Sequence, residues 1–397
     1  MLKAVFGFTL YRVINLLFPI ITLPIILNFV DKSIVGMFFV LQSYAFWVSL
    51  IIDFGFIRTG VVDYINAKEK TRSSVITEII FSQLILLLII ILITFPVLLF
   101  FDVNYKYYVF VIFTGFIQGF VPKWLYQAEN RMLKLSFYES ISKIIGLVVL
   151  YILMNINPNL ESIIYSYITM YLLTISLVIF DKRDTNINIK EVNFEMLLNK
   201  IKESKDVFFM RVIGNGYLNC NVILLSVLST PDVIAIYGLC ERVVKAISSI
   251  VTSFGEAIFP LGIAKSKISS VSKNLVISVL YSMPVVIFSL IFSKEIILIL
   301  SGESVELGFK SVIFISPIFF AMSTVLSLNK IVANGLYKLD LMIQIVILFL
   351  SSIALILLYL LFDTSYPYFS FLASSIISFL CYYVAVSCKS QRELVKL

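Results

Sequence analysis

The sequence has no histidine, only four cysteines and a small share of charged residues. Without histidine, a histidine proton relay, a histidine-ligated metal and Ser-His-Asp catalysis are all excluded. The cysteines lie in or at the end of apolar runs and lack the paired spacing of metal ligands, so we expect no disulfide, metal site or cofactor. Charged residues make up 14% of the chain, against roughly 25% in soluble domains, and this shortage argues against a soluble fold.

Most of the chain consists of apolar runs of membrane-spanning length. Hydrophobic residues make up 60% of it, and a run such as Ile79–Phe101 can cross about 30 Å of hydrocarbon as a helix. A membrane β-barrel would instead need alternating strands of about ten residues. The sequence predicts an all-α polytopic membrane protein with about 12 transmembrane helices, the first retained and not cleaved. We place them at 5–30, 34–62, 74–101, 106–128, 136–154, 160–180, 206–229, 232–261, 273–293, 307–329, 339–362 and 366–388.

The basic residues are distributed unequally between the two sides of this arrangement. The termini and the loops on one side carry 21 of the 31 lysines and arginines, and the loops on the other side carry four. The positive-inside rule therefore places both termini in the cytoplasm, and this count assigns Lys143 to a cytoplasmic loop. The same rule accounts for the net charge of +7, so the charge gives no support to nucleic-acid binding.

The least hydrophobic stretch, Asp181–Asp206, lies near the middle of the chain with six predicted spans on either side. Four of its apolar residues recur at helical spacing: Phe194, Leu197, Leu198 and Ile201. The stretch can be an amphipathic surface helix or a solvated connector, and both alternatives stay open. We expect an N-terminal six-helix lobe over 1–180, a cytoplasmic linker over 181–205 and a C-terminal six-helix lobe over 206–397.

The two predicted lobes share a local sequence similarity. The chain reads LYRVINLLFP around Arg12 and FMRVIGNGYL around Arg211, an offset of 199 residues. The same offset brings Ile34–Phe38 onto Val233–Tyr237 without a gap. Because both stretches enter the membrane from the cytoplasm, the similarity predicts a parallel repeat whose axis lies along the membrane normal.

Several ionisable residues fall inside predicted spans. A charge there costs at least about 2.5–3.5 kcal/mol unless it has a partner or faces a watery cavity. Arg12 either reaches back to the inner interface or faces a cavity, and Arg211 has the same two alternatives. Asp53 and Arg58 are near enough in sequence either to pair or to face a cavity separately.

The eighth predicted span carries a second group of charges near its middle. Glu241 and Lys245 are four residues apart and can neutralise each other, which leaves Arg242 as the deepest basic group. Glu256, near the inner end of this span, has no obvious partner. Lys123 is expected to anchor its span at the inner interface.

Four stretches of the chain carry a family resemblance. They are Val35–Ile65, Val121–Met132 (VPKWLYQAENRM), Ile234–Phe259 followed by Pro260, and Lys294–Gly302. They resemble corresponding segments of the Wzx-type O-antigen flippases, within the multidrug/oligosaccharidyl-lipid/polysaccharide exporter superfamily. Val121–Met132 is similar to a Pro-x-Trp-aromatic-x-Gln-Gly-x-Glu pattern and departs from it at Ala128, where glycine is usual. The resemblance covers essentially the whole chain.

The resemblance implies a transporter and not an enzyme. It implies a flippase that moves undecaprenyl-pyrophosphate-linked O-antigen units across the bacterial inner membrane for lipopolysaccharide or surface polysaccharide biosynthesis. Its partners would be the polyprenyl-pyrophosphate-linked oligosaccharide, membrane lipid, and the polymerase and chain-length regulator of the same pathway. The alternatives are a small-molecule or drug exporter of the same superfamily and a membrane glycan polymerase, which generally needs a larger outer loop than this chain offers.

A pyrophosphate substrate gives the charges inside the membrane a predicted role. Guanidinium groups bind phosphate through bidentate, charge-assisted hydrogen bonds. We therefore predict a pyrophosphate and sugar cavity lined by Arg12, Arg58, Arg211 and Arg242. Three acidic residues are candidates for coupling transport to protons or sodium ions: Asp53, Glu241 and Glu256.

Overall fold

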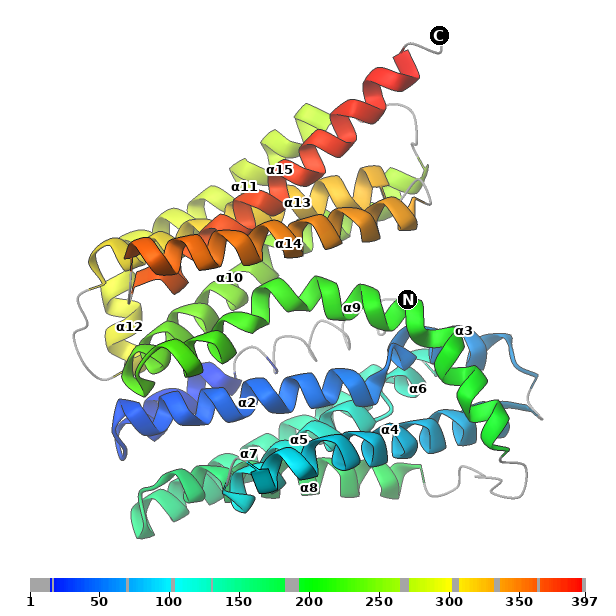
Figure 1. The fold of residues 1–397 in the computed structure, drawn as a ribbon, viewed down its shortest axis with the longest axis vertical. Coiled ribbons are helices and arrows are strands. Elements are labelled where there is room, and N and C mark those ends of the chain that lie inside the picture. The colour runs from blue at the N-terminus through cyan, green and yellow to red at the C-terminus, as the bar shows by residue number, and fades with distance from the viewer. Residues whose placement is uncertain are drawn as a thin grey trace. The chain divides into compact units, whose positions relative to one another are not determined.

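The computed structural model describes residues 15, 18–68, 71–100, 104–129, 131–182, 193–264, 271–301, 307–331, 336–362 and 365–394. Every regular element in these ranges is helical, so the predicted all-α class is confirmed. The chain divides into two compact units, Met1–Val212 and Ile213–Leu397, and the division falls inside one long helix. The predicted lobe boundaries and the repeat between the lobes stay predictions. Figure 1 shows the helices of each unit lying side by side.

The first unit contains a short apolar helix, Phe18–Leu27, followed by seven labelled helices and part of an eighth. The seven are α2 (Lys32–Asp53), α3 (Phe56–Asn66), α4 (Arg72–Phe100), α5 (Tyr105–Phe120), α6 (Lys123–Ala128), α7 (Met132–Ile156) and α8 (Leu160–Asp181). The eighth is α9 (Phe194–Leu228), whose first part belongs to this unit.

The second unit contains the rest of α9 and eight further helical elements. They are α10 (Pro231–Ala264), α11 (Val271–Ile291), α12 (Ser293–Ser301), a 3-10 helix (Gly308–Ile315), α13 (Ser316–Leu326), a π-helical turn (Ser327–Ile331), α14 (Tyr337–Phe362) and α15 (Tyr366–Leu394).

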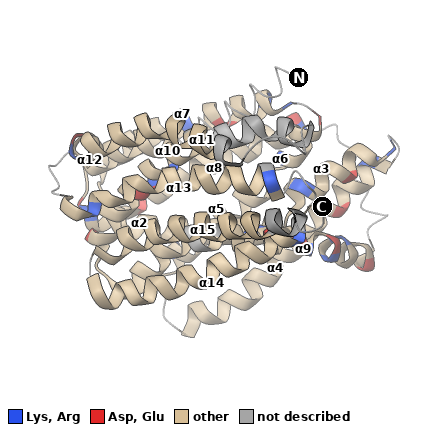
Figure 2. Cartoon of the chain, turned by 90° about the horizontal axis from the view of Figure 1, so that it is seen from above, with Lys and Arg blue, Asp and Glu red and all other residues tan. Residues whose placement is uncertain are grey.

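Eight of the described helical segments are long and apolar enough to cross a membrane, and the number rises to ten if two bent pairs each count as one span. The most apolar of them, α4 and α14, expose large side chains such as Leu92 and Leu360 along most of their length. In a membrane protein such side chains face lipid. Figure 2 shows long uncharged stretches of helix, with most charged residues near helix ends. The protein is a polytopic membrane protein, and the count of twelve stays a prediction.

Two glycines bring α5 into close contact with α2. A Cβ atom added at Gly115 would lie 2.7 Å from the Ala45 carbonyl oxygen, and one at Gly119 would lie 2.5 Å from the Ser49 carbonyl oxygen. The two glycines are four residues apart, so they lie on one face of α5 and allow the backbones to approach. Gln83 of α4 donates a hydrogen bond to the Gly119 carbonyl oxygen at 3.0 Å, which ties a third helix to this contact.

One assignment in the count of basic residues is wrong, although the predicted span 136–154 agrees with α7. Lys143 was assigned to a cytoplasmic loop, but it lies in the interior of α7 and is only 9% exposed. It is 11 residues from the start of α7 at Met132, or about 16 Å along the helix. A buried lysine at this depth needs a partner, and the structure supplies one in the pocket described below.

Candidate functional site

The second predicted span is broken between α2 and α3. Phe54 and Gly55 both adopt left-handed conformations, with φ of 40° and 85°, and α3 begins directly after them. The first part of α9 packs against this break. The Phe208 ring stacks on the Phe54 ring with centroids 4.2 Å apart, and Val207 lies against Gly55.

Three polar contacts join the same part of α9 to α2 and α3. Arg211 forms an ion pair with Asp53, the last residue of α2. About two turns before Arg211 on α9, Ser204 shares a hydrogen bond of 2.8 Å with Thr59. About one turn further, Lys200 forms an ion pair with Asp63. Ile201 packs into the apolar core of this unit. The predicted linker therefore contains a helix from Phe194 onwards. Two of its four apolar residues, Phe194 and Leu198, are exposed, so the amphipathic surface helix stays a prediction.

The break gives a direct prediction for Gly55. Gly55→Ala should lower the melting temperature, because a left-handed conformation costs an L-residue roughly 1–2 kcal/mol and its Cβ would lie 3.0 Å from Val207. Gly308→Ala is the matched control, since Gly308 also has a positive φ but nothing within 4 Å of an added Cβ. Thermal unfolding of the purified variants should show the larger loss for Gly55→Ala. Equal losses would mean that the contact with α9 contributes nothing.

The predicted basic residues of the first unit lie in different environments. Asp53 has Arg211 as its ion-pair partner, and Arg58 lies beyond the break on α3 with an exposed side chain. The alternative pairing of Asp53 with Arg58 is therefore not the one that the structure has. Arg12 lies outside the described residues. The predicted cavity roles of Arg12, Arg58, Arg211 and Asp53 stay predictions.

In the second unit, the expected neutralisation of Glu241 by Lys245 is confirmed. Their side chains form an ion pair of 3.0 Å, and Lys245 also donates a hydrogen bond to Asn219 on α9 at 2.7 Å. Arg242 is partly buried on α10 beside this pair. The side chain of Glu256 lies outside the described part of the chain. The predicted roles of Glu241, Arg242 and Glu256 stay predictions.

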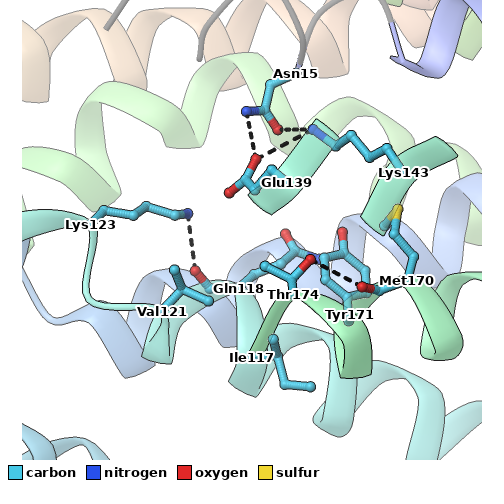
Figure 3. A pocket seen from close by; sticks show the side chains of 10 residues that line it. All are labelled: Asn15, Ile117, Gln118, Val121, Lys123, Glu139, Lys143, Met170, Tyr171 and Thr174. Atoms are coloured by element: carbon cyan, nitrogen blue, oxygen red, sulfur yellow. Dashed lines mark hydrogen bonds and ion pairs between the residues drawn. The ribbon is translucent and has the colours of Figure 1, made fainter. Parts of the chain in front are cut away.

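A polar pocket inside the first unit was not foreseen. It has a volume of about 90 Å³, and α5, α7 and α8 supply most of its lining. Figure 3 shows its ten lining residues: Asn15, Ile117, Gln118, Val121, Lys123, Glu139, Lys143, Met170, Tyr171 and Thr174. Lys143 donates to Asn15 at 2.8 Å and lies 3.4 Å from the Glu139 carboxylate, which also accepts a hydrogen bond from Asn15 at 3.0 Å.

Lys123 faces this pocket and does not act simply as an interface anchor. Its ammonium group donates a hydrogen bond to the Gln118 carbonyl oxygen at 3.1 Å, and its side chain is partly buried. Glu139 and Lys143 are four residues apart within the predicted span 136–154, and that spacing was the signal that could have revealed them. Because Lys143 was counted as a loop residue, its pairing with Glu139 was not predicted.

The segment with the VPKWLYQAENRM resemblance connects α5 to α7 through α6 and contacts α8. Tyr126 donates a hydrogen bond to Asp181 at 2.7 Å, and Asp181 also pairs with Lys134. Glu129 pairs with Lys182 at 2.5 Å. These contacts join the ends of α6, α7 and α8, so the segment has an evident structural role.

The second unit also holds a buried carboxylate that the sequence did not single out. Asp340 is 4% exposed and accepts hydrogen bonds from Ser327 at 2.8 Å, Gln344 at 2.8 Å and Tyr382 at 2.9 Å. These donors come from the π-helical turn, α14 and α15. Among the described residues, no group of three or more histidine, cysteine, aspartate or glutamate side chains is placed to hold a metal ion.

Comparison with known protein families shows which family the chain belongs to. Residues 1–262 match the model of a family described as polysaccharide biosynthesis protein. The chain belongs to the polysaccharide biosynthesis protein family. A protein from Shigella dysenteriae named "Putative O-antigen transporter" is 21% identical to this family member over 344 residues, which is 82% of this chain and 84% of the relative.

Solved structures show which fold this family member has. The lipid II flippase MurJ, in an inward closed conformation, matches 98% of this chain and 88% of its own with a TM-score of 0.73 and 13% identity. A multidrug resistance MATE family transporter of the MOP superfamily, in an inward-facing conformation, matches 96% and 95% with a TM-score of 0.59 and 14% identity. The chain therefore has the fold that these flippases and exporters share.

Proposed function

We propose that the protein is a flippase that moves undecaprenyl-pyrophosphate-linked O-antigen oligosaccharide units across the bacterial inner membrane, with both termini in the cytoplasm. The family match over residues 1–262 carries the proposal, because it ties a membrane-transporter fold to polysaccharide biosynthesis. The similarity to an O-antigen transporter and to a lipid II flippase supports a lipid-linked glycan as the substrate. The flipped units would enter lipopolysaccharide or surface polysaccharide biosynthesis, where a polymerase and a chain-length regulator act next.

The proposed binding site for the head group uses arginines. Arg242 and Arg12 are the first candidates, with Arg58 and Arg211 beside them and Asp53, Glu241 and Glu256 as candidates for ion coupling. Arg211 is already paired with Asp53, so phosphate would have to compete with a carboxylate for its guanidinium group. Arg242 is tested first because it is the deepest basic group of the predicted spans.

Reconstitution in liposomes tests this function. A fluorescent polyprenyl-pyrophosphate oligosaccharide is placed in one leaflet, and its appearance in the other is followed for wild type, Arg242→Ala and Arg12→Ala. Each variant should slow crossing at least tenfold, because a hydrogen bond to a charged group is worth about 1.5–3 kcal/mol. Lys106→Ala is the control. Lys106 pairs with Glu161 near the first residues of α5 and α8, so this variant should leave the crossing rate unchanged.

Each other outcome of the liposome assay has one meaning. If both arginine variants move the lipid at the wild-type rate, the proposed binding site is contradicted and the proposed flippase function is not. No crossing of the lipid by wild type, together with uptake of small cationic drugs, would replace the flippase with an exporter of the same fold. Lengthening of glycan chains by the purified protein would favour a polymerase instead.

A further inference from the structure

The pocket of the first unit contains an unequal number of charges. Its lining includes two ammonium groups, on Lys123 and Lys143, and one carboxylate, on Glu139. Glu139 and Lys143 are 8% and 9% exposed, so these charges are largely removed from water. In Figure 3 the two lysine side chains reach toward the same space from opposite sides, with Glu139 between them.

The two lysines differ in how their donors are used. Lys143 has a carboxylate at 3.4 Å and an amide oxygen at 2.8 Å. Lys123 has three N–H donors, and within the described ranges its one hydrogen bond goes to a neutral carbonyl oxygen. No carboxylate of a described residue lies within ion-pair distance of Lys123. The described lining of the pocket therefore has one more basic group than acidic groups, and Glu139 forms its ion pair with Lys143.

A positive charge in a membrane-embedded pocket is costly without a counter-ion. An anionic group would supply that counter-charge, and ammonium groups on two sides would donate hydrogen bonds to its oxygens. The Asn15 side chain and the Tyr171 hydroxyl add further polar groups around the same space. A volume of about 90 Å³ suits one compact group and not a chain of sugars.

We propose that this pocket binds an oxyanion, a phosphoryl or carboxylate group of the transported molecule, between Lys123 and Lys143. Glu139 keeps Lys143 in position and limits the affinity, because its negative charge repels the same ligand. The group can come from the lipid pyrophosphate or from an acidic sugar. This inference rests on the proposed function for its source of ligand, but binding of a small anion can be measured without transport.

Thermal unfolding of the purified full chain in nanodiscs, at constant ionic strength, tests the pocket. A ligand that binds the folded state raises the melting temperature in a saturable way. The probes are inorganic pyrophosphate, D-glucuronate and neutral D-glucose. Wild type should be stabilised by an anionic probe and not by glucose. Preference for pyrophosphate would assign the phosphoryl source, and preference for glucuronate the acidic sugar.

Three substitutions in the pocket should change the affinity for the anion, two of them lowering it and one raising it. Lys123→Met and Lys143→Met should each weaken anion binding about tenfold, whereas Lys106→Met, outside the pocket, should leave it unchanged. Glu139→Gln should tighten anion binding several-fold, because it removes the repulsion and keeps a hydrogen-bonding side chain. Glu139→Gln also remains informative if Lys143→Met fails to fold.

Weaker anion binding in Glu139→Gln, or equal stabilisation by all three probes, would overturn the proposal. Sodium ions give the opposite check. If sodium raised the melting temperature of wild type, raised that of Lys123→Met further and had no effect on Glu139→Gln, the pocket would be a cation site and the proposal would be overturned. Failure of the pocket is distinguishable from failure of the flippase function. If wild type moves the lipid across liposomes but binds no anion, only the pocket proposal is contradicted. If it binds the anion but does not move the lipid, only the flippase proposal is contradicted.

Discussion

Gly119→Leu should abolish the accumulation of folded protein. The first side-chain atom would already meet the Ser49 carbonyl oxygen at 2.5 Å, and this neighbour is backbone that cannot rotate away. Helices α2 and α5 would have to separate, and the hydrogen bond from Gln83 to the Gly119 carbonyl oxygen would be strained or lost. Overpacking of a core typically costs about 1–3 kcal/mol, and a leucine at this backbone contact should exceed that range.

Size-exclusion chromatography of detergent extracts, with a thermal melt of any monodisperse fraction, measures this effect. Gly119→Ala should give a folded but less stable protein. Val109→Leu is the matched control, because Val109 lies on the same helix with 53% of its surface exposed and should accept a larger side chain. A monodisperse Gly119→Leu protein with the melting temperature of wild type would show that α2 and α5 do not pack as described.

Breaking the pair between Asp53 and Arg211 should produce the second large loss. The two side chains are 14% and 25% exposed, so either one left alone is a largely buried charge. Removing one partner of a buried ion pair costs about 3–5 kcal/mol. Arg211→Ala and Asp53→Ala should therefore each lower the melting temperature strongly. The double variant should recover part of the loss, because it leaves no uncompensated charge.

The same double-mutant cycle separates a structural role of Arg211 from a role in substrate binding. A positive coupling between Asp53→Ala and Arg211→Ala in stability, with transport restored in the double variant, would identify the pair as structural. Transport that stays lost in the folded double variant would assign Arg211 to the substrate. Arg58→Ala is the matched control, since its exposed side chain should make it neutral in stability. Additive losses for Asp53 and Arg211 would contradict the ion pair.

The membrane fold could be predicted because hydrophobicity in long runs is a strong signal that depends on neighbouring residues alone. The run Ile79–Phe101 corresponds to α4, and the apolar spacing from Phe194 to Ile201 corresponds to the start of α9. Glu241 and Lys245 were also predictable as a pair, because one helical turn joins them. In each case the information lies within one continuous stretch of sequence.

The candidate site was harder to predict because its partners are distant in sequence. The sequence offered Arg58, five residues away, as one alternative partner for Asp53, but the structure pairs Asp53 with Arg211 on another helix. Asn15 and Lys143 are more than a hundred residues apart, and only the packed bundle brings them together. The break at Gly55 was also missed, since a glycine within an apolar run does not reveal the left-handed conformation that it adopts.

The position of the unit boundary has a consequence for synthesis. The first unit ends at Val212, so it includes the part of α9 that carries Ile201 and Arg211, although its preceding helix ends at Asp181. When the last residue of α8 has just been added to the chain, Arg211, the partner of Asp53, has not yet been synthesised. At about 5–20 residues per second, the missing segment takes roughly 2–6 s to be made. During that time Asp53 has no arginine partner, so we expect the incomplete first unit to be less stable than the finished one.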